Sequence, residues 1–130
     1  MLRANFSPRE VSLPDLDASP GMLYHAATMS KVHFYFKLVP PRSTFPHDIT
    51  EPEKALMAEH AVYARQQFEA GKLLLYGPVM SPEGAFGVGI LEVADEAEAR
   101  QFGENDPSVR AGLNRFEFHP MRVAAARAKH

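Results

Sequence analysis

The sequence predicts an α+β fold, a ferredoxin-like β-α-β-β-α-β sandwich with both helices on one face of one antiparallel sheet. Three observations support this prediction. Strand and helix patterns follow one another in that order within residues 31–124. Two of the strands alternate phenylalanine with more polar residues, which is the period of a half-buried strand. Both helices begin at a capping residue that is followed by glutamate three positions later.

The first strand is expected over Val32 to Val39, where Phe34 and Phe36 alternate with more polar residues. Pro40-Pro41 ends this strand, because proline lacks the N–H group that the ladder needs. The segment 41–49 is therefore expected to be a loop.

The first helix is expected to begin at Thr50, because Glu53 completes a capping box with it and Pro52 is tolerated in a first turn. Its apolar positions continue to Phe68. Gly71 then lies where a left-handed residue ends a helix. This helix is the most strongly signalled element of the chain.

A hairpin is expected next. Leu73 to Tyr76 form a short buried-type strand that ends at Gly77-Pro78. The segment Ser81 to Gly84 has proline and glycine at the positions that a tight turn favours. Ala85 to Val93 return as the third strand.

The second helix is expected to start at Asp95, with Glu98 as the partner of a second capping box. It breaks near Gly103. Asp106-Pro107 then predicts one further turn of helix, because aspartate caps a helix and proline suits its first position. Gly112 ends that turn.

The last strand is expected around Phe116 and Phe118. Right-handed crossovers then place the first and third strands at the centre of the sheet and the second and fourth at its edges. In this arrangement His33 and His119 face each other on neighbouring strands. Two short helices leave the other face of the sheet uncovered, so we expect a homodimer that packs sheet against sheet.

Three regions are predicted along the chain: an N-terminal extension over 1–30, a folded domain over 31–124 and a C-terminal tail over 125–130. The extension has no sustained apolar period. It is either a natural extension draped over the domain or added sequence upstream of an ordinary start at Met29 or Met22. In both cases we expect it to be dispensable for folding.

The composition narrows the possible functions. The absence of cysteine excludes disulfides, thiolate nucleophiles and iron–sulfur clusters. The net charge of −2 and the scattered Lys and Arg argue against a nucleic-acid partner. No apolar run approaches the roughly 20 residues that span a bilayer, and Leu2 to Asn5 are too polar and too few for a signal peptide. We therefore expect a cytoplasmic domain with no membrane partner.

His60 is the most informative residue for chemistry. On a helical wheel it falls between Leu56 and Ala64, inside the apolar face, where a histidine needs partners for its ring nitrogens. The simple interpretation is a hydrogen-bonded core histidine. Gly87 and Gly89 occupy one face of the third strand and carry no side chains. If that face meets this helix, they either leave a hollow near His60 or allow close packing.

Asp106 is the second candidate, although its pattern equally suits an ordinary helix cap. A catalytic role requires His60 within hydrogen-bond reach. No histidine spacing predicts a metal site, and the glycines of 84–89 lie within a strand rather than in a nucleotide-binding loop. Ser81 and Ser108 lack the surroundings of a serine nucleophile. We therefore expect neither a metal nor a cofactor.

Together these residues resemble the YCII family (YciI-like proteins) over about residues 31–124. The resemblance rests on a set of motifs in a fixed order. They are Pro41-Arg42-Ser43-Thr44-Phe45, Thr50-Glu51-Pro52-Glu53, Met57-Ala58-Glu59-His60, Gly71-Lys72-Leu73, Leu75-Tyr76-Gly77-Pro78, Gly84-Ala85-Phe86-Gly87-Val88, Glu98-Ala99, Asn105-Asp106-Pro107 and Ala111-Gly112-Leu113.

The resemblance implies a dimeric α/β-barrel built on the ferredoxin-like unit. It also implies a catalytic dyad formed by His60 and Asp106, both of which are present. One similar class of proteins removes chloride from a chlorinated hydroxyhydroquinone, which implies lyase or dehydrohalogenase chemistry without a cofactor. Nothing functional carries over onto residues 1–30.

Two functions are expected. The first is a cofactor-independent small-molecule enzyme in which His60 is the general acid or base and Asp106 holds its other ring nitrogen, for elimination, dehydrohalogenation or isomerisation. In it, Arg42 binds an anionic or phenolic oxygen and Tyr63 lines the pocket. The alternative is a non-catalytic, homodimeric ligand-binding module. A solvent-connected pocket with His60 against Asp106 favours the enzyme, and a buried His60 bonded only to backbone favours the module.

Overall fold

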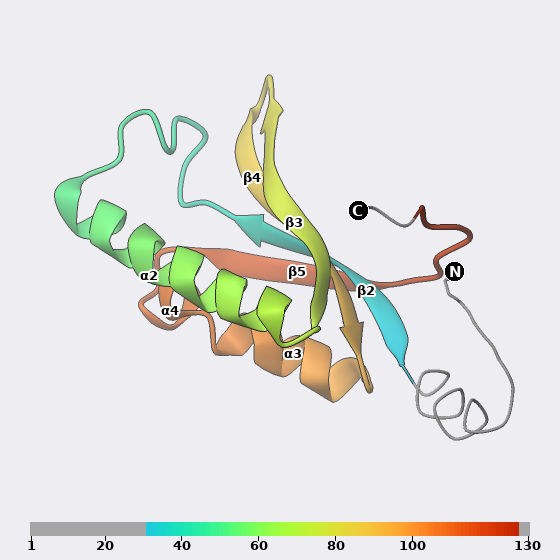
Figure 1. The fold of residues 1–130 in the computed structure, drawn as a ribbon. Helices are drawn as coiled ribbons and strands as arrows, with labels where there is room; N and C mark the ends of the chain where they lie inside the picture. The colour runs from blue at the N-terminus through green and yellow to red at the C-terminus, as the bar shows by residue number, and fades with distance from the viewer. Residues whose placement is uncertain (1–30, 128–130) are drawn as a thin grey trace, which may run out of the picture. The chain divides into compact units, whose positions relative to one another are not determined.

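A computed structural model of the chain describes residues 31–127. In chain order its elements are β2 (Val32–Val39), α2 (Glu51–Glu69), β3 (Leu73–Ser81), β4 (Gly84–Val93), α3 (Glu96–Glu104), α4 (Pro107–Arg110) and β5 (Arg115–Met121) (Figure 1). The predicted α+β class is confirmed, and α4 is the short turn of helix expected after Asp106. The expected extension over 1–30 lies outside the described residues, and residues 122–127 contain no helix or strand.

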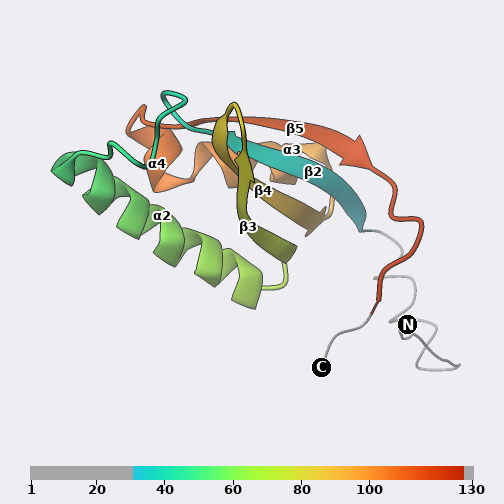
Figure 2. The ribbon, with the colours of Figure 1, turned by 90° about the horizontal axis from the view of Figure 1, so that it is seen from above.

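The strands form one antiparallel sheet in the order β3-β4-β2-β5, which places the first and third strands at the centre as predicted (Figure 2). The register corrects one expectation. Tyr35 lies opposite His119, and His33 lies opposite Met121, so the two histidines are offset by two positions. His33 instead places Nε2 3.1 Å from a carboxylate oxygen of Glu92. Alternation fixes which face a side chain takes but leaves the offset between strands open.

The first helix begins as its sequence predicts. The Thr50 side chain accepts a hydrogen bond from the N–H of Glu53, and the Glu53 side chain accepts one from the N–H of Thr50. Pro52 lies in the first turn. The helix closes at Ala70, and Gly71 follows with φ of 86°. This left-handed angle suits a residue without Cβ, so the turn into β3 depends on glycine.

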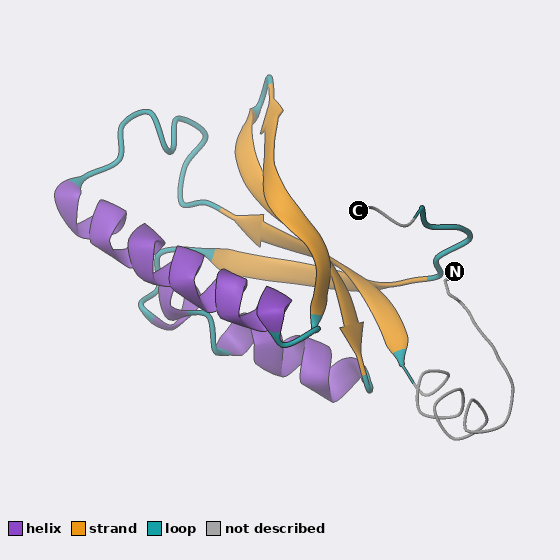
Figure 3. Cartoon of the chain, in the orientation of Figure 1, coloured by secondary structure: helices purple, strands orange, loops and turns teal. Residues whose placement is uncertain are grey.

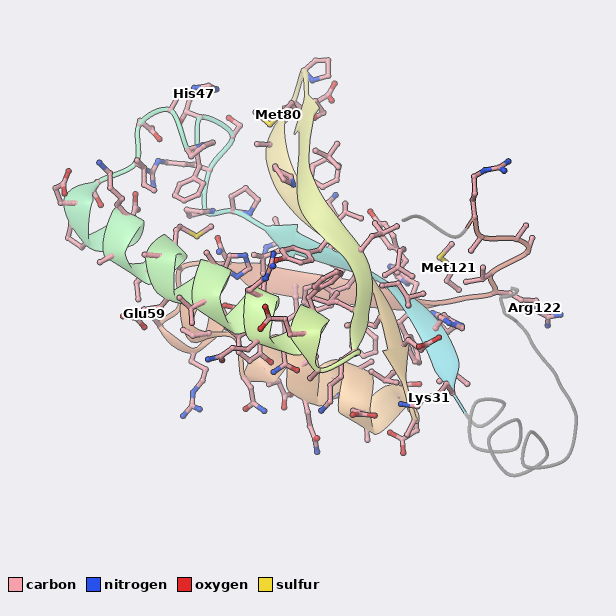
Figure 4. The ribbon with its side chains drawn as sticks, viewed as in Figure 1. Lys31, His47, Glu59, Met80, Met121 and Arg122 are labelled. Atoms are coloured by element: carbon pink, nitrogen blue, oxygen red, sulfur yellow. The ribbon has the colours of Figure 1, made fainter. Side chains whose placement is uncertain are left out.

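The second strand is longer than predicted. The sequence pattern predicts its end at Gly77-Pro78, but the strand continues to Ser81. Pro78 is accommodated because β3 is an edge strand, and edge strands are where a sheet tolerates proline. Met80, which is 65% exposed, lies near the tip of the β3–β4 hairpin (Figure 4).

The core lies on one face of the sheet. Phe34, Phe36 and Leu38 of β2 are buried there together with Leu91 and Val93 of β4. Both long helices pack on this face, since Phe102 of α3 belongs to the same cluster and Tyr63 of α2 packs against it. The rings of Phe36 and Phe102 meet edge to face at 4.9 Å between centroids. Figure 3 shows α2 and α3 together on one side of the sheet.

Gly103 provides a stability test of this packing. A Cβ added to Gly103 would lie 2.6 Å from ring carbons of Phe116 in β5. Although alanine is the better helix former by about 1 kcal/mol, we expect Gly103→Ala to lower the free energy of unfolding by about 1–3 kcal/mol, because the Phe116 ring must move. Urea denaturation measures this change. Gly77→Ala is the control, since a Cβ there meets nothing within 4 Å, and a stabilised Gly103→Ala protein would contradict the expectation.

Candidate active site

His60 and Asp106 are hydrogen-bonded neighbours in the folded chain. His60 lies on α2, and Asp106 is the N-cap residue of α4, 46 positions later. The packing of α4 against α2 places His60 Nδ1 2.7 Å from Asp106 Oδ2. The predicted proximity of these two residues is confirmed.

The carboxylate of Asp106 is satisfied by three donors. Asp106 is 1% exposed. Its Oδ1 accepts from both the N–H and the hydroxyl of Ser108, each at 2.8 Å, while Oδ2 faces His60. Burial alone raises the pKa of Asp106, but the bonds from His60 and Ser108 outweigh burial and hold that pKa below its usual value of 3.8. The carboxylate is therefore ionised at neutral pH.

This ionised carboxylate determines the proton positions on His60. A carboxylate only accepts hydrogen bonds, so Nδ1 carries the hydrogen that faces Asp106. In the neutral imidazole the other nitrogen, Nε2, then keeps a free lone pair. No residue among 31–127 hydrogen-bonds to Nε2, and the His60 side chain remains 24% exposed. His60 thus offers a base at the wall of a cavity.

That cavity has a volume of about 420 Å³ and lies between α2 and the sheet. Most of its walls are apolar or aromatic. They include Phe36, Leu38, Phe45, Pro46, Ile49, Met57, Ala61, Ala64, Leu73, Tyr76, Phe86 and Phe102. No lysine or arginine lines it, and Asp106 is its charged residue. Its volume falls in the range of small-molecule sites.

Gly87 and Gly89 of β4 line the same cavity as His60, which agrees with the first of the two alternatives considered for them, a hollow near His60. The space that remains is limited. A Cβ on Gly89 would lie 2.9 Å from a methyl group of Leu73, and one on Gly87 would lie 3.3 Å from Cβ of Leu38. The glycines therefore keep the sheet side of the cavity open while neighbouring side chains approach closely.

A salt-bridge cluster holds the loop that closes one side of the cavity. Arg42 donates through Nε to the carboxylate of Asp48 at 3.0 Å and through its terminal nitrogens to Glu53 at 2.8 and 2.9 Å. The hydrogen bonds between Arg42 and Glu53 lower the pKa of Glu53 to about 2, and they raise the pKa of Arg42. The loop is thus tied to the first turn of α2, and its Phe45 and Ile49 face the cavity.

Two expected ligand contacts, at Arg42 and Tyr63, stay predictions. Arg42 is occupied by its two carboxylates and lies outside the lining of the His60 cavity. Tyr63 also lies outside that lining, and its hydroxyl donates to the carbonyl oxygen of Phe102 at 2.7 Å. Burial and the negative charge of Asp106 raise the pKa of Tyr63 to about 12. In the observed arrangement Arg42 fastens the loop and Tyr63 joins α2 to α3.

Two further polar residues complete the site and were not identified from the sequence as part of it. Ser108 and Asn114 are 0% and 5% exposed. Asn114 Nδ2 donates to Ser108 Oγ at 2.9 Å and approaches the sulfur of Met57 at 3.4 Å. The Asp106-x-Ser108 spacing is a local signal for the first residue, because a capping aspartate binds the N–H two positions on. Asn114 has no such signal, since its contact with Met57 spans 57 positions.

Two features are absent from residues 31–127. These residues contain no group of three or more His, Asp or Glu side chains placed to hold a metal ion. They also contain no helix that is long and apolar enough to cross a bilayer.

The comparisons with known proteins concern the same region. The profile of the YCII-related domain matches residues 34–122. No curated protein sequence matches the chain.

Among solved structures, 5-chloro-2-hydroxyhydroquinone dehydrochlorinase from Burkholderia phenoliruptrix AC1100, in complex with 2,5-dihydroxybenzoquinone, is similar with a TM-score of 0.53 and 19% identity. The match covers 69% of this chain and 93% of that one. An uncharacterised protein from Thermotoga maritima is similar with a TM-score of 0.46 and 13% identity, and the match covers 71% of this chain and 99% of that one. SnoaB, a cofactor-independent oxygenase from Streptomyces nogalater, is similar with a TM-score of 0.42 and 11% identity, and the match covers 76% of this chain and 98% of that one. The first match shows a shared fold.

The lowered pKa of Asp106 has a consequence for stability. Its ionised form stabilises the fold fully above the unfolded-state pKa near 3.8, and this stabilisation is lost as pH falls through the lower folded-state pKa. Asp106→Asn keeps an acceptor for Ser108 but cannot ionise. We expect it to cost about 1–3 kcal/mol of unfolding free energy at neutral pH and progressively less in acid, as measured by urea denaturation across pH. Asp95→Asn, at an N-cap that accepts from Glu98, is the control, and a cost independent of pH would contradict the expectation.

Proposed function

This chain belongs to the family of YCII-related domains, and from that premise we propose that it is a small-molecule enzyme that uses His60 and Asp106 for general acid/base catalysis. The observation that carries the proposal is the hydrogen bond from His60 Nδ1 to the buried Asp106 carboxylate, which leaves Nε2 at the wall of an apolar cavity. A histidine bonded only to backbone would instead favour the ligand-binding module.

In the proposed reaction His60 Nε2 removes a proton from a carbon or oxygen of the bound substrate. The imidazole becomes an imidazolium, and the Asp106 carboxylate stabilises its positive charge. If the proton returns at another position, the product is an isomer. If a leaving group departs with its bonding electrons as the C–H electrons form the new double bond, the reaction is an elimination. Both reactions balance without an external oxidant or reductant.

Dehydrohalogenation is one such elimination, and it is the reaction named for the dehydrochlorinase that shares this fold. The apolar walls favour it, since water is a poor competitor in such a cavity and the attraction between imidazolium and carboxylate is stronger there. These walls and the lack of lysine or arginine among them also favour a neutral substrate.

We also propose that the protein forms a homodimer through the helix-free face of the sheet. The registers place Leu75, Ile90, Tyr35 and His119 in one row across the four strands, on the face opposite the buried core. Leu75 is 58% exposed in the single chain. A second copy packed on this row would remove these side chains from water.

A base-catalysed probe reaction tests the role of His60. In 5-nitrobenzisoxazole a base removes the ring C–H proton while the N–O bond breaks, which gives a coloured cyanophenolate. We expect His60→Gln to slow this reaction on the order of 10²–10⁴-fold, because glutamine hydrogen-bonds but does not take up a proton near neutral pH. Asp106→Asn should reproduce most of the loss. Glu59→Gln is the control, since Glu59 is exposed on the same helix (Figure 4).

A wild-type protein that is no faster than His60→Gln would contradict the general-base role. Binding of the probe without turnover would favour the ligand-binding module.

Sedimentation velocity tests the dimer. We expect the wild-type protein at micromolar concentration to have a sedimentation mass of twice its chain mass of 14.5 kDa. A stable interface of this kind should bury a total area above roughly 1,200 Å². Leu75→Asp should shift the protein to the monomer, because it places a charge in the interface. Val62→Asp serves as control, since Val62 is 59% exposed on α2, and a wild-type species of 14.5 kDa alone would rule out the dimer.

A further inference from the structure

We infer that Asn114 is a ligand-recognition residue, whose side-chain oxygen accepts a hydrogen bond from a hydroxyl or N–H group of a neutral ligand in the His60 cavity. Asn114 lines this cavity and is 5% exposed. Its Oδ1 is buried and has no hydrogen-bond partner among the described residues. A buried acceptor left without a donor is costly and uncommon in folded proteins, so this atom points to a group that arrives with the ligand.

The orientation of the Asn114 amide follows from its neighbours. The ionised Asp106 carboxylate only accepts, so the Ser108 hydroxyl must give its hydrogen to Asp106. The Ser108 oxygen is then an acceptor, and it requires the NH₂ group of Asn114 at 2.9 Å. A flipped amide would place two acceptors against each other. Oδ1 is therefore the atom left over.

One carboxylate thus leaves two acceptors without a donor on residues that line the cavity. On one side, Asp106 takes the Nδ1 hydrogen of His60 and leaves the Nε2 lone pair. On the other side, through Ser108, it fixes Asn114 with Oδ1 free. A ligand that satisfies both must present two donors. Ether and ketone oxygens, which only accept, do not match either position.

The remaining walls define the rest of the ligand. Aromatic and aliphatic side chains surround the cavity, and no lysine or arginine lines it to balance an anion. The negative charge of Asp106 disfavours an anion further. The cavity of about 420 Å³ accommodates a molecule of one or two rings. The ligand class is therefore a neutral, mainly apolar molecule with two hydroxyl or N–H groups.

This inference rests on the same cavity and the same His60 tautomer as the proposed function, but it concerns binding and not turnover. Its test is accordingly an equilibrium measurement. Isothermal titration calorimetry of the full chain compares 1,2-, 1,3- and 1,4-dihydroxybenzene with their dimethyl ethers. Each ether keeps the ring and both oxygens but has no donor. We expect at least one diol to bind about 10-fold or more tightly than its ether, since two hydrogen bonds are lost.

Variants assign this selectivity to Asn114. Asn114→Leu has a similar size and no acceptor, and we expect it to reduce the diol-to-ether affinity ratio by about 3- to 10-fold while ether binding persists. Asn105→Leu is the control, because it makes the same chemical change at an exposed residue outside the lining of the cavity. The ratio should not change in this control.

Two results would overturn the inference. Equal binding of diol and ether by the wild-type protein would mean that Oδ1 is satisfied by water. This result is obtained on the wild-type protein alone, so it does not depend on the folding of a variant. An unchanged ratio in Asn114→Leu would place the selectivity elsewhere. The probe reaction separates the two proposals. Donor-selective binding without base catalysis would support Asn114 as the recognition residue and contradict the general-base role of His60. Base catalysis without donor-selective binding would support the general base and contradict the recognition role of Asn114.

Discussion

The buried carboxylate of Asp106 is the interaction on which the site depends. Taking an ionised carboxylate out of water costs several kcal/mol unless donors replace the water. Ser108 supplies two of these donors from the adjacent turn, and His60 supplies the third from a helix 46 positions away. The local bonds form the cap of α4, and the distant bond ties α4 to α2. Stability and the orientation of the site therefore come from the same three hydrogen bonds.

Because a carboxylate accepts and never donates, it gives a direction to every bond connected to it. The Asp106 carboxylate makes His60 Nδ1 a donor directly. It also makes the Ser108 hydroxyl a donor, so that the Ser108 oxygen accepts from the Asn114 amide. The base and the proposed recognition atom are consequently not independent. A change at Asp106 alters the tautomer of His60 and the orientation of the Asn114 amide together, so its effects on binding and catalysis do not separate cleanly.

Small residues line the cavity on both its helix side and its sheet side. Ala64 on α2 and the glycines at 87 and 89 on β4 lie on opposite sides of the space. A well-packed interior normally leaves no void of this size. The loop that closes the cavity is held in place by its charges rather than by its packing alone, since Arg42 joins it to the first turn of α2.

The sequence by itself determined the parts of this protein that depend on neighbours along the chain. The capping box at Thr50, the left-handed Gly71 and the helical turn after Asp106 were all predictable, because each is fixed by bonds within a few residues. The apolar surroundings of His60 also follow from helical periodicity, and its pairing with Asp106 was expected from the family resemblance.

Only the tertiary structure decided the remainder. The offset between His33 and His119 depends on how two strands slide past each other, and the length of β3 depends on its place at the edge of the sheet. Arg42 binds to carboxylates that a linear pattern does not single out. Asn114 is the clearest case. Its burial and its unfilled oxygen arise where the turn after α4 meets α2, and no local pattern encodes a contact between residues 57 positions apart.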